Sequence, residues 1–169
     1  MPQVSQRGIE LPASPIRKLT PFADQAKKRG MKVYHLNIGQ PDLPTPEKAL
    51  NAVRKIGRKT LEYSPSQGLK SLRDKFAVYY RKYGIDLSPE QIIVTAGGSE
   101  ALLATFLTCF DEGDEVIITE PGYANYLGFA KAAGLTVKAV TSRIEDRFAL
   151  PSAEDFRKAI TPKTKAILI

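Results

Sequence analysis

The sequence predicts an α/β protein built on a largely parallel sheet with flanking helices. Three observations support this fold class. From residue 91 onward, short apolar runs alternate with segments of helical spacing, which is typical of βαβ units. The runs are rich in Ile and Val, as expected for strands that are buried on both faces. Turn sequences such as DEGD separate the segments.

The second half of the chain supplies most of the expected sheet. Its predicted strands are QIIVT, EVIIT, TVKAV and KAILI, and its predicted helices are SEALLATFLTCF, YANYLGFAKAAG and SAEDFRKAI. Ser152 and Asp155 have the spacing of a capping box that opens the last helix. The chain ends within KAILI, and a central parallel strand needs neighbours, so we expect the N-terminal part of a longer protein. A small domain that ends on an exposed strand is the alternative.

The first half is expected to be less regular. Residues 1–13 are predicted to form an extended arm, followed by a helix that kinks or begins at Thr20 and stops at Gly30. KVYHLNIG is predicted as a short strand that runs into the proline-rich loop GQPDLPTPE. A helix opens at the end of that loop. The clearest amphipathic helix spans Leu69 to Tyr83, with Gly84 as its C-cap.

Composition excludes several classes of protein. The chain has 169 residues, of which 43% are hydrophobic, with no run near the roughly 20 residues of a membrane span and no signal-peptide core. The net charge of +7 comes from Lys and Arg on polar helix faces without a nucleic-acid motif. We therefore expect solvated helix faces, no nucleic acid and no membrane partner. The single cysteine, Cys109, is predicted to be buried in the core, with no disulfide or metal site and a cytoplasmic location.

A Gly-Gly-Ser turn lies between a predicted strand and a predicted helix, in TAGGSEALLATF. A helix N-terminus carries partial positive charge, and glycines let its backbone approach a bound group closely, so Gly97, Gly98 and Ser99 can cradle a phosphate. The alternative is a tight turn with Ser99 as helix cap. Glu100 would repel an anion if its side chain pointed inward, so both interpretations stay open at this point.

A second feature follows the next strand, in EPGYANY. The carboxyl ends of parallel strands meet at one edge of a sheet, so Tyr123 is expected near the Gly-Gly-Ser turn. Its ring can lie against a flat ligand, or it can simply pack over the loop. Neither a Gly-x-Gly-x-x-Gly fingerprint nor a Walker-type loop is present, so the ligand is not expected to be a nucleotide of those classes.

Four segments occur in the order and spacing seen in one family: LNIGQPDLPTPE, YSPSQGLKSLRDKFAVYY, IIVTAGGSEALL and FDEGDEVIITEPGYANY. They resemble the class I aminotransferases of the aspartate and aromatic type, which have pyridoxal-phosphate fold type I. The resemblance implies an arm and small-domain segment at residues 1–45. Residues 46–169 would then be the N-terminal part of an incomplete large domain that binds the cofactor.

The resemblance assigns cofactor contacts to four of these residues. Gly97, Gly98 and Ser99 match the turn that holds the phosphate of pyridoxal 5'-phosphate. Tyr123 matches the aromatic residue that stacks on the pyridine ring. The implied reaction moves an amino group between an amino acid and a 2-oxo acid.

Two further residues are assigned by resemblance alone. Tyr63 matches a tyrosine that reaches the cofactor phosphate of the neighbouring subunit, which implies a homodimer with composite active sites. Gly39 matches a loop glycine whose backbone lies beside the substrate carboxylate.

The resemblance also shows what this chain lacks. The family's Schiff-base lysine, pyridine-pairing aspartate and carboxylate-binding arginine follow the stretch that matches KAILI, so no catalytic residue is assigned here. The chain alone is expected to be inactive. Another pyridoxal-phosphate reaction, such as carbon–sulfur lysis or decarboxylation, and a non-catalytic fragment remain alternatives.

Overall fold

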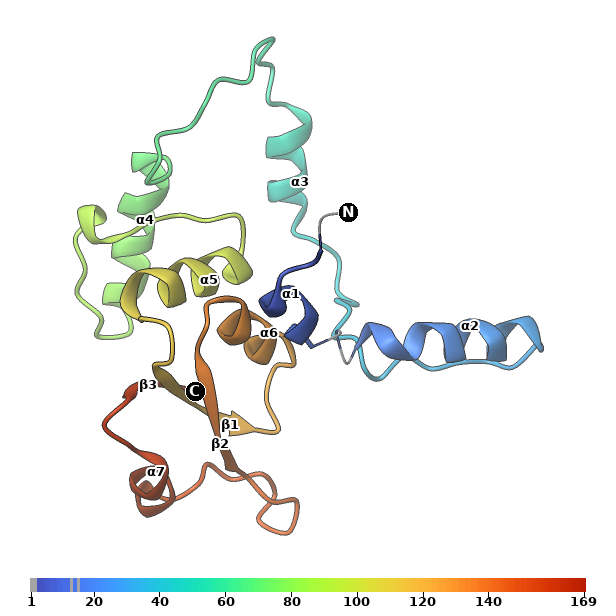
Figure 1. The fold of residues 1–169 in the computed structure, drawn as a ribbon. Helices are drawn as coiled ribbons and strands as arrows, with labels where there is room; N and C mark the ends of the chain where they lie inside the picture. Colours follow the sequence, from blue (N-terminus) through green and yellow to red (C-terminus); the bar gives the residue numbers. More distant parts are fainter. Residues whose placement is uncertain (1–2, 13, 15) are drawn as a thin grey trace. The chain divides into compact units, whose positions relative to one another are not determined.

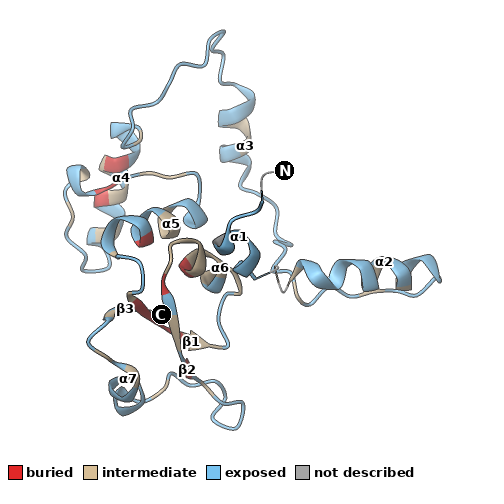
Figure 2. Cartoon of the chain, viewed as in Figure 1, coloured by how far each residue is buried: buried red, intermediate tan, exposed pale blue. Residues whose placement is uncertain are grey.

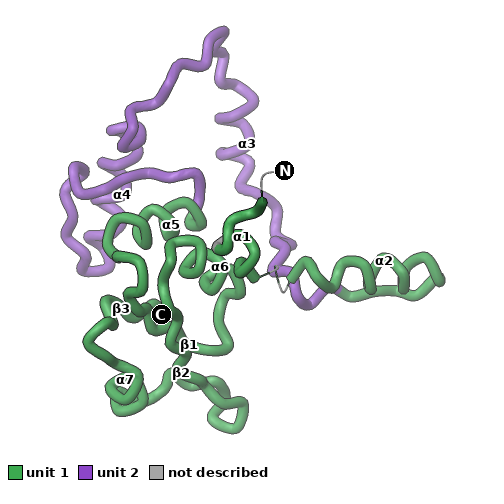
Figure 3. Tube along the Cα trace, in the orientation of Figure 1, with its two compact units in different colours: residues 1–34, 98–169 green, residues 35–97 purple. Residues whose placement is uncertain are grey.

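The computed structural model describes residues 3–12, 14 and 16–169. The chain forms two compact units, one of Met1–Tyr34 with Gly98–Ile169 and one of His35–Gly97 (Figure 3). Each unit is described by itself. No helix in the described part of the chain is both long and apolar enough to cross a bilayer.

The first unit is built on a three-stranded parallel sheet (Figure 1). Its strands are β1 (Glu115–Glu120), β2 (Thr136–Thr141) and β3 (Thr164–Leu168), in the order β2-β1-β3. Glu115 is paired with Thr136 and Glu120 with Thr141, so the carboxyl ends of β1 and β2 lie at the same edge. The predicted α/β fold class with a parallel sheet is confirmed.

Helices connect and cover these strands. In the first unit they are α1 (Gln6–Glu10), the 3-10 turn η1 (Arg17–Leu19), α2 (Thr20–Lys28), α5 (Gly98–Cys109), α6 (Asn125–Ala132) and α7 (Ala153–Ala159). α5 and α6 contact each other beside the sheet, whereas α7 lies apart from them (Figure 1). The connection from β1 to β2 and the connection from β2 to β3 run in opposite directions across the sheet. If both are right-handed, as is usual for parallel strands, their helices α6 and α7 lie on opposite faces.

The core lies on both faces of β1. Val116 and Ile118 pack with Phe106 of α5 and Ala130 of α6 on one face. Ile117 points to the other face and is completely buried. Within the first unit, most of the described buried residues accordingly lie on the central strand and on α5 and α6 (Figure 2). This double burial explains why EVIIT contains an uninterrupted apolar run.

The predicted capping box of α7 is confirmed. The Ser152 hydroxyl accepts a hydrogen bond from the Asp155 backbone N–H at 3.2 Å, and the Asp155 carboxylate accepts one from the Ser152 backbone N–H at 3.1 Å. The Ser152 hydroxyl also donates to that carboxylate at 2.6 Å. These bonds lower the pKa of Asp155, with the side chain of Ser152 as the largest cause.

The second unit contains α3 (Glu47–Arg54), α4 (Lys70–Arg81) and the 3-10 turn η2 (Pro89–Gln91). α4 packs against η2 and buries Arg73 and Ala77. The helix predicted over Leu69 to Tyr83 is therefore confirmed to within two residues at each end.

Two predicted strands are wrong. KVYHLNIG and QIIVT form no strand, and Gln91 belongs to η2. Ile92 has an extended backbone, but a strand also requires a ladder of hydrogen bonds. Among the described residues, ladders join only β1 with β2 and β1 with β3.

Two smaller expectations are also corrected. The predicted extended arm contains the one-turn helix α1, whose first turn is capped where the Ser5 hydroxyl accepts from the Gly8 N–H at 3.1 Å. Cys109 is exposed rather than buried. Phe110 packs on the core instead, with its ring centroid 5.6 Å from that of Phe106, and so fills the place that the pattern gave to Cys109.

Candidate functional site

The turn before α5 has the backbone geometry that the glycines allow. Gly97 has a φ of +88°, a conformation that side chains with a Cβ rarely adopt. Its N–H donates to the Thr95 carbonyl at 2.8 Å, and the Thr95 hydroxyl donates to the Gly97 carbonyl at 2.9 Å. A Cβ added at Gly97 or Gly98 would meet no atom within 4 Å. The start of α5 therefore presents bare backbone to open space.

A cavity of about 370 Å³ lies beside this helix start. Its lining comes from the first turns of α5 and from the segment after β1: Gly98, Ser99, Leu102, Tyr123, Tyr126 and Phe129. The volume falls within the range of about 300–1,000 Å³ that is typical of small-ligand sites. The structure thus brings Tyr123 to the same cavity as Gly98 and Ser99, which precede it by more than twenty residues in the sequence.

Local contacts hold the ring of Tyr123. Its centroid lies 5.3 Å from that of Tyr126, with the ring planes at 84°. The Asn125 side-chain amide donates to the Tyr123 hydroxyl at 2.7 Å. Tyr123 remains 49% exposed, so part of the ring is accessible to a ligand.

Sequence reasoning missed three of the lining residues. Leu102 and Phe129 also pack against the hydrophobic core, and their apolar character indicated only burial. Tyr126 lies in the quoted EPGYANY segment, three residues after Tyr123. Side chains three residues apart meet on a helix, so this spacing could have predicted that Tyr126 lies beside Tyr123.

The electrostatics of the cavity favour an anion at its α5 end. The first N–H groups of a helix have no partner within the helix and carry partial positive charge. The Ser99 hydroxyl adds a donor at the same place. Glu100 is exposed and is not one of the residues that line the cavity. Donors at one end and an aromatic face with apolar walls at the other suit a flat ligand that carries a phosphate.

Three of the other predicted site residues lie in the second unit. Tyr63 is completely exposed, with a relative accessibility of 105%. Gly39 is exposed in the loop that precedes α3, and a Cβ there would meet nothing within 4 Å. Gly97 ends this unit and is bonded directly to Gly98. The roles of Tyr63 and Gly39 stay predictions.

Residues 31–169 match the family model described as "Aminotransferase class I and II". The match covers most of the chain. The chain belongs to this aminotransferase family. The predicted family resemblance is therefore confirmed.

Individual aminotransferases are similar along almost the whole chain. The aspartate aminotransferase of Thermotoga maritima is 36% identical over 98% of this chain and 44% of that protein. The aspartate/prephenate aminotransferase of Thermus thermophilus is 35% identical over 86% of this chain and 38% of that protein. A solved Thermus thermophilus aspartate aminotransferase covers all of this chain with a TM-score of 0.92 and 34% identity, and 44% of that structure is matched. The chain thus spans less than half the length of these aminotransferases.

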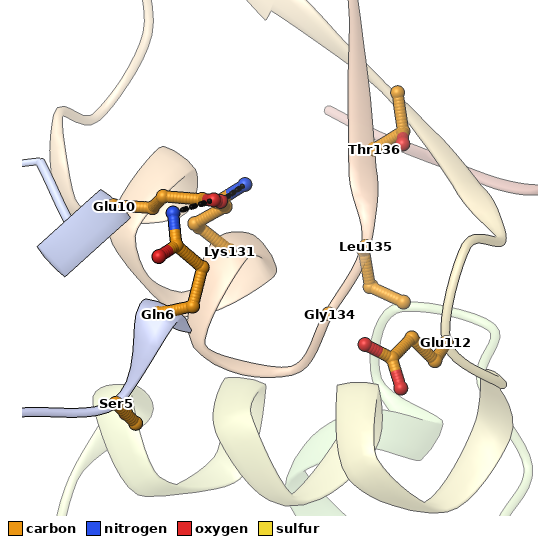
Figure 4. A pocket seen from close by; sticks show the side chains of 8 residues that line it. All are labelled: Ser5, Gln6, Glu10, Glu112, Lys131, Gly134, Leu135 and Thr136. Carbon is orange, nitrogen blue, oxygen red and sulfur yellow. Dashed lines mark hydrogen bonds and ion pairs between the residues drawn. The ribbon is translucent and has the colours of Figure 1, made fainter. Parts of the chain in front are cut away.

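A second cavity, of about 550 Å³, has a different character from the cavity at the start of α5 (Figure 4). It lies between α1, the end of α6 and the start of β2, at the amino edge of the sheet. Lys131 and Glu10 form an ion pair at 2.6 Å across it, and Gln6 donates to Glu10 at 2.9 Å. Lys131 is the main reason that the pKa of Glu10 is lowered. Ligands of open α/β sheets bind at the carboxyl edge, so this cavity is an attachment point for α1 rather than the site.

Proposed function

We propose that this chain supplies the cofactor-anchoring part of a pyridoxal-phosphate-dependent aminotransferase. The reaction moves an amino group between an amino acid of the aspartate or aromatic type and a 2-oxo acid. The observation that carries the proposal is the convergence of Gly98, Ser99 and Tyr123 on one cavity. The family membership and the names of the similar proteins support the reaction class.

The residues present fit the two chemically distinct ends of pyridoxal 5'-phosphate. The backbone N–H groups at the start of α5 and the Ser99 hydroxyl would bind the phosphate. The Tyr123 ring would lie against the pyridine, positioned by Asn125. Leu102 and Phe129 would keep water from the ring. When bound, the cofactor supplies an electron sink for negative charge at the substrate α-carbon.

Other parts of the enzyme complete the proposal. Tyr63 would reach the cofactor phosphate bound in the second subunit of a homodimer, and the Gly39 backbone would lie beside the substrate carboxylate. Residues 1–45 would contribute to the small domain and residues 46–169 to the large domain. The Schiff-base lysine, the aspartate at the pyridine nitrogen and the substrate-binding arginine would come from sequence that is not in this chain. A cytoplasmic enzyme of amino acid biosynthesis is the setting that we propose.

Spectroscopy of the full-length protein tests the proposal. Purified protein incubated with pyridoxal 5'-phosphate should gain a visible absorbance that borohydride removes while fixing the cofactor covalently. Aspartate, tyrosine and alanine should then be compared as amino donors to 2-oxoglutarate, with formation of glutamate as the readout. Cofactor binding with release of ammonia, sulfide or carbon dioxide and no glutamate would replace transamination by a lyase or decarboxylase. The absence of cofactor binding would refute the proposal.

A further inference from the structure

We propose that Arg73 is a positioning residue that fixes the Tyr63 loop, defined as residues 63–68, to the segment that leads into Gly97. The inference rests on the proposed function and deepens it. It assigns to one buried cation the task of holding two phosphate-binding elements at a fixed separation.

Arg73 is unusual among the basic residues whose burial the structure describes, because it is only 8% exposed. Its Nη1 donates to the Pro89 carbonyl at 2.6 Å, and its Nε donates to the Gly68 carbonyl at 3.3 Å. Within the described residues, Arg73 forms no ion pair with a carboxylate. A buried charge is costly unless it is hydrogen-bonded, and here one backbone carbonyl of the Tyr63 loop and one of η2 each accept a hydrogen bond from the guanidinium.

Gly68 shows how tightly the Tyr63 loop is held on its other side. It has a φ of +90°, and an added Cβ would lie 2.6 Å from Cβ of Val94. The Val94 N–H donates to the Gln67 carbonyl at 3.0 Å, and the Gly68 N–H closes a turn on the Pro65 carbonyl at 2.8 Å. Arg73 therefore clamps the loop from α4, while Val94 contacts it from the segment before Gly97.

The position of Tyr63 depends on this clamp. Its ring is fully exposed, so packing of the side chain does not fix it. It precedes the Pro65–Gly68 turn by two residues, and Val94 precedes Gly97 by three. All these residues belong to one compact unit. Under the proposed function, the clamp sets the position of Gly97, which opens the phosphate turn, relative to the tyrosine that the subunit offers to its partner's phosphate.

A purely structural role for Arg73 predicts a different outcome. It would change overall stability and the affinity for every form of the cofactor alike. A positioning role acts on the phosphate end alone. Pyridoxal, which has the same ring without the phosphate, therefore separates the two possibilities.

The test uses the full-length enzyme with the substitutions Arg73→Lys and Tyr63→Phe, alone and combined. We expect Arg73→Lys to weaken pyridoxal 5'-phosphate binding about five- to tenfold, at the low end of coupling between sites. The affinity for pyridoxal should change by less than about twofold. In the Tyr63→Phe background, Arg73→Lys should have little further effect, because the two residues act through one contact. Arg81→Lys is the matched control, since Arg81 lies on the same helix and pairs with Asp86 on the surface.

Equal losses for pyridoxal 5'-phosphate and pyridoxal, or additive effects of Arg73→Lys and Tyr63→Phe, would overturn the inference. If Arg73→Lys fails to fold, Val94→Ala removes methyl groups from the Gly68 contact and should give the same phosphate-selective loss; no selectivity there would also overturn it. Failure of the proposed function is distinguishable, because the unsubstituted enzyme would then not bind the cofactor at all.

Discussion

The polar groups at the amino ends of the strands in the β2-β1-β3 sheet have different partners from those at the carboxyl ends. At the amino edge, acidic and basic side chains are paired with one another. At the carboxyl edge, the start of α5 and the ring of Tyr123 face a cavity that a small ligand can enter. The same strands build both edges, so the difference arises from the loops and helix ends that each edge carries.

Glu115 is the centre of the amino edge. It is 8% exposed and accepts hydrogen bonds from the hydroxyls of Thr161 at 2.7 Å and Thr164 at 3.3 Å, with Lys138 at 3.6 Å. These contacts join β1 to β2 and to the start of β3. They lower the pKa of Glu115, with the Thr161 hydrogen bond as the largest cause. Mutual pairing of this kind stabilises the fold and leaves little for a ligand to bind.

At the carboxyl edge, neighbouring residues orient Tyr123 but leave part of it exposed. Asn125 bonds the Tyr123 hydroxyl and the Tyr126 ring packs nearly perpendicular to the Tyr123 ring, while Tyr123 stays 49% exposed. Under the proposed function, the ligand binds where groups are positioned by neighbours yet remain accessible. Three substitutions sharpen the contrast, taken from the largest expected effect to the smallest.

The largest effect is expected at Ile117, because the central strand supports both edges. Ile117→Ala should lower the free energy of unfolding by about 2–5 kcal/mol through lost burial and a residual cavity. Chemical denaturation of the full-length protein measures this change. Ile144→Ala is the control, since Ile144 is 67% exposed and should cost less than about 0.5 kcal/mol. A similar cost for both substitutions would show that β1 is not the core of the unit.

An intermediate effect is expected at the carboxyl edge alone. Tyr123→Leu should weaken binding of pyridoxal 5'-phosphate about two- to tenfold, which corresponds to the loss of one aromatic stacking contact. Tyr123→Phe keeps the ring and loses only the hydrogen bond from Asn125. Its affinity for pyridoxal 5'-phosphate should therefore lie between that of the unsubstituted protein and that of the Tyr123→Leu variant. Titration followed by absorbance measures the affinities. Equal affinities for the Leu and Phe variants would exclude stacking as the role of Tyr123.

The smallest effect is expected at the amino edge and depends on pH. The folded-state pKa of Glu115 lies below its usual value of 4.5, so its stabilisation is present above that value and is lost as the pH falls through the folded pKa. Thr161→Val removes the main cause and should therefore destabilise the protein at pH 7, with a smaller difference near pH 3. Denaturation at the two pH values measures this change, with Thr105→Val on the exposed side of α5 as control. A difference that is independent of pH would mean that Glu115 does not gain stability from Thr161.

The spacing of apolar residues correctly predicted those helices and strands that bury side chains at regular intervals. β1 and α4 were placed correctly because their apolar spacing reports the neighbouring sheet or turn. The runs KVYHLNIG and QIIVT have the same local composition but no ladder partner among the described residues, and a strand depends on a partner that lies elsewhere. α1 was missed because a helix of one turn depends on the Ser5 cap and the Glu10–Lys131 ion pair rather than on periodicity.

The site was predicted in a similarly uneven way. Ser99 and Tyr123 were expected to meet because both follow strands at the carboxyl edge, and the segment before Ser99 leads to the same place although it is not a strand. No separate expectation for Arg73, which is buried, came from the sequence. Its burial depends on the carbonyls of Gly68 and Pro89, which no pattern within α4 could reveal.

The central claim is that the start of α5 binds the phosphate of the cofactor, and Ser99→Ala tests it most directly. The full-length protein should bind pyridoxal 5'-phosphate about tenfold or more weakly after this substitution, because a hydrogen bond to a charged group is lost. Its affinity for pyridoxal should be unchanged, and Ser71→Ala on the exposed face of α4 should alter neither. A Ser99→Ala protein that still binds pyridoxal 5'-phosphate as tightly as the unsubstituted enzyme, or that loses pyridoxal to the same extent, would contradict the claim.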